Sequence, residues 1–194
     1  MKAFITLPIL FASLFTLLLS ACAAPILVAG GAAGGAAVAH DERNSKTILN
    51  DTVIETKAKD TIYKDPEMAK RVHINVTSFN NVVLLTGEAL SRSLRDRAIN
   101  IVRNLENVRR VHNEVRIADL TSFSSRTGDT WITSKVKAKM LATKDFDSSR
   151  VKVVTEDSTV FLMGLVSREE GKQAATIASQ ISGVKRVVKI FEYL

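Results

Sequence analysis

The chain has little of what disulfide-bonded proteins, metalloproteins and enzymes use. Its 194 residues include one cysteine, Cys22, so no disulfide can form within the chain. His40, His73 and His112 are scattered, without the spacing of a metal site. No nucleophile-elbow, zinc-protease or phosphate-loop motif occurs. We therefore expect no enzyme, no catalytic residue, no bound metal and no small-molecule substrate.

Proline and tryptophan are scarce as well, with 3 prolines and 1 tryptophan, and 4 of the 9 glycines lie in one segment near the N-terminus. The chain is 46% hydrophobic and 24% charged, which is a globular composition with room for one medium domain or two small ones. The formal net charge of +7 favours an anionic partner, although many basic proteins bind nothing acidic in particular. No aromatic stacking pattern accompanies the basic clusters, so we expect no nucleic-acid partner.

One long uncharged run is present, at the N-terminus. Lys2 precedes the mainly apolar stretch from Ala3 to Leu19, which is the layout of a secretory signal peptide. The run ends in Leu19-Ser20-Ala21-Cys22, which resembles the bacterial lipobox. At such a box the peptidase cuts before the cysteine, whose thiol receives diacylglycerol. We expect a signal peptide over residues 1–21 and, as the only cofactor-like group, a covalent lipid on Cys22. The alternatives are an ordinary signal peptide with a chance cysteine and an uncleaved membrane span.

The segment after Cys22 bears on location. Ala23 follows the cysteine in place of the aspartate that tends to retain enteric lipoproteins at the inner membrane. The lipobox resemblance therefore implies a lipid anchor in the outer membrane, with the protein facing the periplasm. Four glycines between Gly30 and Gly35 disfavour a helix, so residues 22–46 predict a flexible tether. Close packing of helices in lipid is the alternative.

The rest of the chain is an internal repeat. Three blocks of one copy recur in the other in the same order: Asn50–Ile62 with Gly128–Met140, Ile74–Gly87 with Val151–Gly164, and Asn107–Val115 with Gly183–Phe191. The offsets are 78, 77 and 76 residues, which indicates a duplicated module of about 70 residues. We place the modules at residues 47–118 and 129–194, joined by a polar linker at 119–128.

Each copy predicts the element order αββαβ. Ile54, Ala58 and Ile62 are spaced to share one face of a first helix. The β-branched run that follows breaks at Asn80-Asn81, and its equivalent breaks at Glu156-Asp157-Ser158, which predicts two hairpins. A second helix and a last strand follow in each copy. We expect an α+β fold in which each module is a three-stranded mixed sheet with two helices on one face.

Both copies resemble a known domain family. The strand "VVLLTG", the helix after it and "NVRRVHNEV" resemble the BON domain, a module of bacterial envelope proteins, and "VFLMG" and "GVKRV" are the second-copy counterparts. The first copy has Asn107 where the family has glycine, and it keeps Asn113. The second keeps Gly183 but has Lys189 in the place of that asparagine. The resemblance covers residues 47–194 and, with the lipobox, implies a dual-BON outer-membrane lipoprotein that binds anionic phospholipid and supports envelope integrity.

The only tryptophan lies on the first helix of the second copy. At about 100° per residue, Trp131 points away from the core face of that helix. The face it shares continues with Lys135, Ala138 and Ala142, flanked by Ser134 and Leu141. A tryptophan on an outward face suits the membrane–water boundary. The alternative is that its ring packs on the first copy or on the linker.

The charges of this helix support a membrane contact. Residues 130–144 hold four lysines and no acid, whereas the equivalent residues 52–66 hold three lysines and three acids. Each lysine near an anionic leaflet adds about 1 kcal/mol. The predicted phospholipid-binding residues are Trp131, Ser134, Lys135, Ala138, Lys139, Leu141 and Ala142. The other hypothesis is an envelope scaffold that docks on outer-membrane assembly proteins or peptidoglycan-linked factors.

Overall fold

The computed structural model describes residues 43–120 and 123–194. The predicted signal peptide, Cys22 and most of the tether lie outside these residues. Within the described part, no helix is both long enough and apolar enough to cross a membrane.

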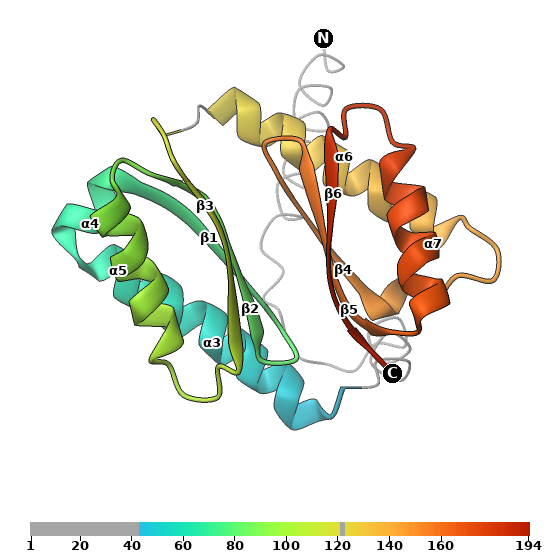
Figure 1. Cartoon of the computed structure of the whole chain (residues 1–194), viewed down its shortest axis with the longest axis horizontal. Helices are drawn as coiled ribbons and strands as arrows, with labels where there is room; N and C mark the ends of the chain where they lie inside the picture. The colour runs from blue at the N-terminus through green and yellow to red at the C-terminus, as the bar shows by residue number, and fades with distance from the viewer. Residues whose placement is uncertain (1–42, 121–122) are drawn as a thin grey trace, which may run out of the picture. The chain divides into compact units, whose positions relative to one another are not determined.

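The described residues form two modules with the same topology (Figure 1). The first comprises α3 (Ser45–Lys64), α4 (Pro66–Arg71), β1 (Val72–Phe79), β2 (Val82–Ala89), α5 (Arg92–Arg103) and β3 (Arg110–Ile117). The second comprises α6 (Phe123–Leu141), the 3-10 turn η2 (Ser148–Arg150), β4 (Val151–Glu156), β5 (Thr159–Val166), α7 (Arg168–Ser179) and β6 (Arg186–Tyr193). In each sheet the middle strand pairs antiparallel with the first strand and parallel with the last. The predicted α+β fold is confirmed.

Each module has its own core between its helices and one face of its sheet. On α3, Ile54, Ala58 and Ile62 are buried, as their spacing predicts, and they pack with side chains of β1 and β2. The corresponding side chains of α6 pack in a second core with β4 and β5; they are Ile132, Val136 and Met140. Each core therefore lies within one module.

Two tight turns close the predicted hairpins. Asn80 and Asn81 have φ of 52° and 61°, and Asp157 and Ser158 have φ of 47° and 61°. Two consecutive left-handed residues are the hallmark of the type I′ turn, which matches the twist of paired strands. An aspartate on the preceding helix stabilises each turn: Asp51 accepts the backbone N–H groups of the first turn, and Asp129 those of the second, all at 2.8 Å.

Three local features differ from the prediction. Helix α6 begins at Phe123, so more than half of the predicted linker at 119–128 is helical. Thr130 Oγ1 donates to the Arg126 carbonyl oxygen at 3.0 Å within this added length. Helix α4 was not predicted; it starts because Pro66 suits a first helical position and Asp65 accepts the next two N–H groups. The turn η2 follows at the equivalent place in the second module and was not predicted either.

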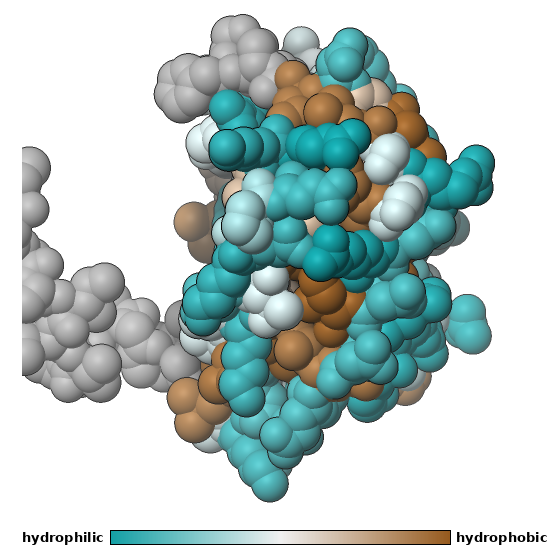
Figure 2. Space-filling view, turned by 90° about the vertical axis from the view of Figure 1, so that its left-hand side faces the viewer, coloured by the Kyte–Doolittle hydropathy of each residue, from teal (hydrophilic) through white to brown (hydrophobic). Residues whose placement is uncertain are grey.

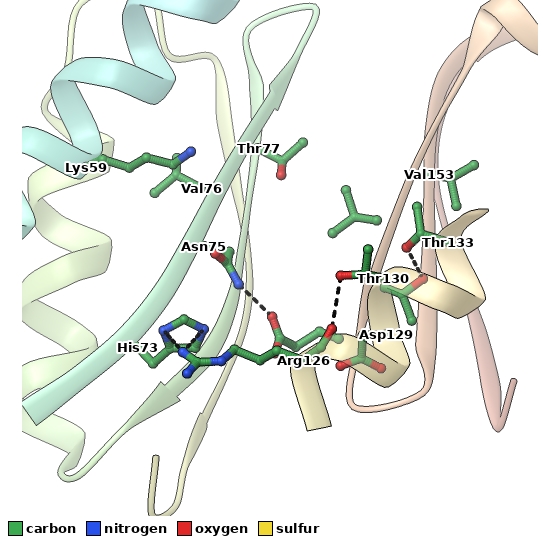
Figure 3. Close-up of a pocket in the computed structure, with 13 residues that line it drawn as sticks. Lys59, His73, Asn75, Val76, Thr77, Arg126, Asp129, Thr130, Thr133 and Val153 are labelled. Carbon is green, nitrogen blue, oxygen red and sulfur yellow. Dashed lines mark hydrogen bonds between the residues drawn. The ribbon is translucent and has the colours of Figure 1, made fainter. Parts of the chain in front are cut away.

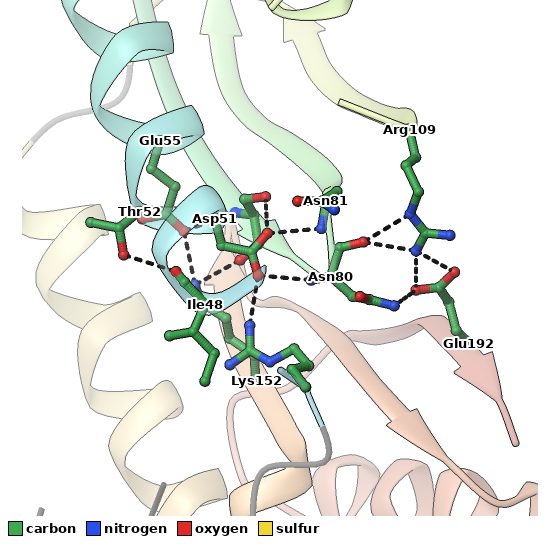
Figure 4. Close-up of polar contacts among 11 residues, drawn as sticks. Ile48, Asp51, Thr52, Glu55, Asn80, Asn81, Arg109, Lys152 and Glu192 are labelled. Carbon is green, nitrogen blue, oxygen red and sulfur yellow. Dashed lines mark hydrogen bonds and ion pairs between the residues drawn. The ribbon is translucent and has the colours of Figure 1, made fainter. Parts of the chain in front are cut away.

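The helix-free faces of the two sheets contact each other. A third apolar cluster joins Phe79, Val82 and Leu84 of the first module to Phe161, Met163 and Ile190 of the second. Ion pairs surround it across the module boundary: Arg109–Glu192 at 2.7 Å, Arg116–Asp157 and Lys152–Glu55 at 2.8 Å, and Arg186–Glu114 at 3.3 Å. Figure 4 shows two of these pairs beside the Asp51 network. An apolar centre with a polar rim is the anatomy of a protein interface.

Candidate functional site

The outward face of α6 is exposed in the structure. Trp131 is 62% exposed and Leu141 is 77% exposed, so the tryptophan ring is not buried against the first module. Lys135 Nζ lies 5.0 Å from the centre of the Trp131 ring, which is a cation–π distance. The other members of the predicted site are exposed too: Ser134, Ala138, Lys139 and Ala142. The structure thus places all seven predicted residues on the outer side of one helix.

Apolar exposure alone does not single out this helix. On α3, Leu49 is 67% exposed and Val53 is 47% exposed. Figure 2, which looks at the first module, also shows brown apolar surface between hydrophilic side chains. The helices differ in charge, since α3 carries Glu55 and Asp60 and the described sequence from Thr130 to Lys144 carries no acid. The two helices therefore differ in the charge they present to solvent rather than in apolar exposure.

A small hollow lies beside the C-terminal end of α6. It has a volume of about 290 Å³ and is lined by Lys137, Met140, Leu141, Ser148 and Val151. In the first module Tyr63 occupies the position equivalent to Leu141, and its hydroxyl bonds the N–H and the carbonyl of Ile74 at 2.9 and 3.0 Å. Burial raises the pKa of Tyr63 despite those bonds, so the hydroxyl keeps its proton at neutral pH. Leucine cannot make these bonds, and its side chain points to solvent.

A larger cleft lies where the two modules meet (Figure 3). Its volume is about 400 Å³, and its lining comes from α3, β1, α6 and β4. The polar side chains in its lining include Lys59, His73, Thr77, Arg126, Thr130 and Glu156. Sequence analysis missed this cleft because it forms only when the two sheets meet. The one available signal was the run of polar residues at alternate positions of β1, namely His73, Asn75 and Thr77.

Glu156 is a buried acid in this cleft. Its Oε2 accepts hydrogen bonds from Asn75 Nδ2 and Thr86 Oγ1, both at 3.0 Å and both from the other module. Burial raises the pKa of the Glu156 carboxyl; the two hydrogen bonds oppose that shift, and the nearby Glu88 adds to it. The net effect is that the neutral form of Glu156 fits the folded protein better than the charged form.

Replacing Glu156 by glutamine should therefore flatten the pH dependence of stability. Because the folded-state pKa is raised, Glu156 contributes its full stability below the unfolded pKa, near 4.5, and loses that contribution as pH rises through the raised value. The melting temperature of Glu156→Gln relative to that of the parent should rise as the pH is raised above about 4.5. Glu106→Gln, which changes an exposed glutamate, is the control and should show no such trend. A pH-independent difference for Glu156→Gln would contradict the argument.

No group of His, Cys, Asp and Glu side chains in the described residues is arranged to hold a metal ion.

The sequence matches a known domain family. A model of the BON domain family matches residues 50–119 and 128–194, and the chain belongs to that family. It is similar to the outer membrane lipoprotein DolP of Haemophilus influenzae, with 36% identity over 179 residues and 92% of each chain covered. It is also similar to the 21 kDa hemolysin of Actinobacillus pleuropneumoniae, at 33% identity with 79% of each covered.

A third relative is the osmotically-inducible protein Y of Escherichia coli, 33% identical over 72% of this chain and 70% of the relative. With these relatives the chain is an outer-membrane lipoprotein built of BON domains, with a role in the cell envelope. Asn107 and Gly183, where the two copies depart from each other, have φ of 68° and 98°. Both residues hold the left-handed conformation, so the asparagine replaces the family glycine without changing the turn.

Proposed function

We propose that this lipoprotein holds the second module against anionic phospholipid through the outward face of α6 and thereby supports envelope integrity. The observation that carries the proposal is an exposed Trp131 with Lys135 beside it, on a stretch that has four lysines and no acid. The ring would enter the headgroup region, where its apolar body and its N–H both find suitable surroundings.

The lysines supply the long-range part of the attraction. Lys137 and Lys139 are exposed on the same helix, and three such charges add about 3 kcal/mol near an anionic leaflet. That is modest and sensitive to salt, but a lipid on Cys22 would keep the module close to a membrane, so a weak contact is enough. Leu141, beside its hollow, extends the apolar contact toward the end of the helix.

Charge reversal tests the proposal. We expect Lys135→Glu, Lys137→Glu and Lys139→Glu together to weaken co-sedimentation of residues 43–194 with anionic vesicles by about 100-fold or more. Trp131→Ala should weaken it by about tenfold, since a buried aromatic contributes over 1 kcal/mol. In the parent, Trp131 emission should shift to the blue with anionic vesicles only, and salt should reverse the shift.

The matched control reverses the same number of charges elsewhere. Lys46, Lys57 and Lys70 are exposed on the first module, and their joint replacement by glutamate gives the same net charge. Equal losses in the two triple variants would reduce the effect to net charge and refute the α6 assignment. Binding that ignores headgroup charge, with cross-links from position 131 to protein only, would favour the scaffold hypothesis.

A further inference from the structure

The cleft between the modules contains an arginine that forms no ion pair with a carboxylate of the described residues. Arg126 is half-buried on the first turns of α6, and its Nε is buried without a hydrogen-bond partner. Its side chain contacts one side chain of the other module: Nη1 lies 3.3 Å from His73 Nδ1 and 3.5 Å from His73 Nε2. An uncompensated donor inside a cleft is costly, and it calls for an acceptor.

The geometry of this contact leaves the donors of Arg126 available. Ring nitrogens accept hydrogen bonds in the ring plane, and the two nitrogens of one imidazole point in different directions. One Nη1 that is nearly equidistant from both nitrogens therefore lies over the ring face, as Figure 3 shows. Because both contacts are made by Nη1, Nη2 is left for another acceptor, and the edge of a guanidinium matches two oxygens of a phosphate or carboxylate.

The two acids that line the cleft are already engaged. Asp129 accepts the backbone N–H groups of Asp157 and Ser158. Glu156 accepts Asn75 and Thr86 from the first module. Neither carboxylate forms an ion pair with Arg126 in the described structure, because each one faces the donors of the turn or of the module contact.

We propose that this cleft binds a phosphate group, with the Arg126 guanidinium as its main ligand. Lys59 of α3 lines the same cleft and adds a second positive charge to it. The cleft of about 400 Å³ is large enough for a phosphate with a short substituent. The ligands come from both modules, so the bound phosphate also ties the modules together.

This site is separate from the membrane contact. Arg126 and Trp131 are five positions apart on α6, which places their side chains about 140° apart around the helix. Trp131 is exposed on the outside, whereas Arg126 lines the cleft. Two sources of the phosphate share the same chemistry: a free phosphate or phosphate monoester, and the phosphodiester of a lipid headgroup.

The test is a titration of residues 43–194, followed by amide NMR at constant ionic strength. One arm uses inorganic phosphate and the other uses glycerophosphoglycerol, a soluble phosphodiester headgroup without acyl chains. We expect saturable shifts at the amides of His73, Arg126 and Thr130, and a rise in melting temperature with ligand. Arg126→Gln should weaken the affinity about tenfold or more, because it removes a charged bidentate donor.

The control removes an arginine charge from the other basic hollow. Arg110 is exposed and lines, with Arg103 and Arg109, a hollow of about 310 Å³. Arg110→Gln should leave the cleft titration unchanged. Saturation by both ligands or by inorganic phosphate alone supports the site, and saturation by the diester alone supports it with a lipid headgroup as the source. The proposal is overturned if neither ligand saturates, or if Arg126→Gln, shown to be folded by its dispersed spectrum, binds as the parent does.

The two proposals fail separately. Arg126→Gln should keep its binding to anionic vesicles, because the lysines and Trp131 of α6 are untouched. A variant that lost vesicle binding and phosphate binding together would show that the cleft and the outward face are one site, and it would overturn the separate cleft.

Discussion

Replacing Phe161 by alanine should loosen the contact between the two modules and lower the free energy of unfolding by about 3–5 kcal/mol. Phe161 is 2% exposed and sits in the cluster that joins the two sheets, together with Leu84 and Met163. It lies outside the cores that each module builds with its own helices. We therefore expect thermal unfolding to separate into two transitions, followed by calorimetry and by the methyl NMR signals of Leu84 and Met163.

Phe146→Ala is the matched control. Phe146 is 9% exposed and packs in the core of the second module, so the same truncation removes a similar ring from a different place. This variant should destabilise the second module while the methyl signals of Leu84 keep their positions. If Phe161→Ala unfolds in one transition at the parent midpoint, the inter-sheet cluster does not hold the modules together.

The cores and hairpins of the modules were predictable because they repeat at short range. A helical period at Ile54, Ala58 and Ile62 and a strand break at Asn80-Asn81 are properties of neighbouring residues. The contact between the sheets is different. A strand alternates its side chains between two faces, so apolar residues on both faces of β5 do not say what the second face meets. Pairs such as Arg109 with Glu192 join residues 83 positions apart, and no local pattern predicts them.

The candidate site likewise has one part that the sequence predicts and one part that it does not. The outward position of Trp131 follows from the angle per residue of a helix, so the sequence alone predicts it. Arg126 fell in the segment predicted to be a linker, because Ser, Thr and Gly around it are typical of loops. Its meeting with His73, 53 positions away, depends on how the sheets pair. The cleft therefore exists only when the two modules pack together.

Replacing Gly87 by alanine should lower the free energy of unfolding by about 3–5 kcal/mol. Gly87 has φ of +109°, a conformation that residues with a side chain rarely adopt. A Cβ at this position would also collide with the carbonyl oxygen of His73 on the neighbouring strand. Since that oxygen is backbone, the strand itself would have to move. Urea unfolding of residues 43–194 measures the loss.

Gly128→Ala is the control for the loss of glycine itself. Gly128 lies inside α6, and a Cβ there meets nothing within 4 Å, so this variant should be stabilised by about 0.5–1 kcal/mol. The equivalent of Gly87 in the second module is Gly164, whose Cβ would lie 2.5 Å from the Arg150 carbonyl oxygen without a left-handed φ. Gly164→Ala should therefore be costly through the collision alone, and Gly87→Ala should cost more because strain adds to it. Equal stability of Gly87→Ala and the parent would mean that β1 yields to the new methyl, and the rigidity assigned to this strand pair would be wrong.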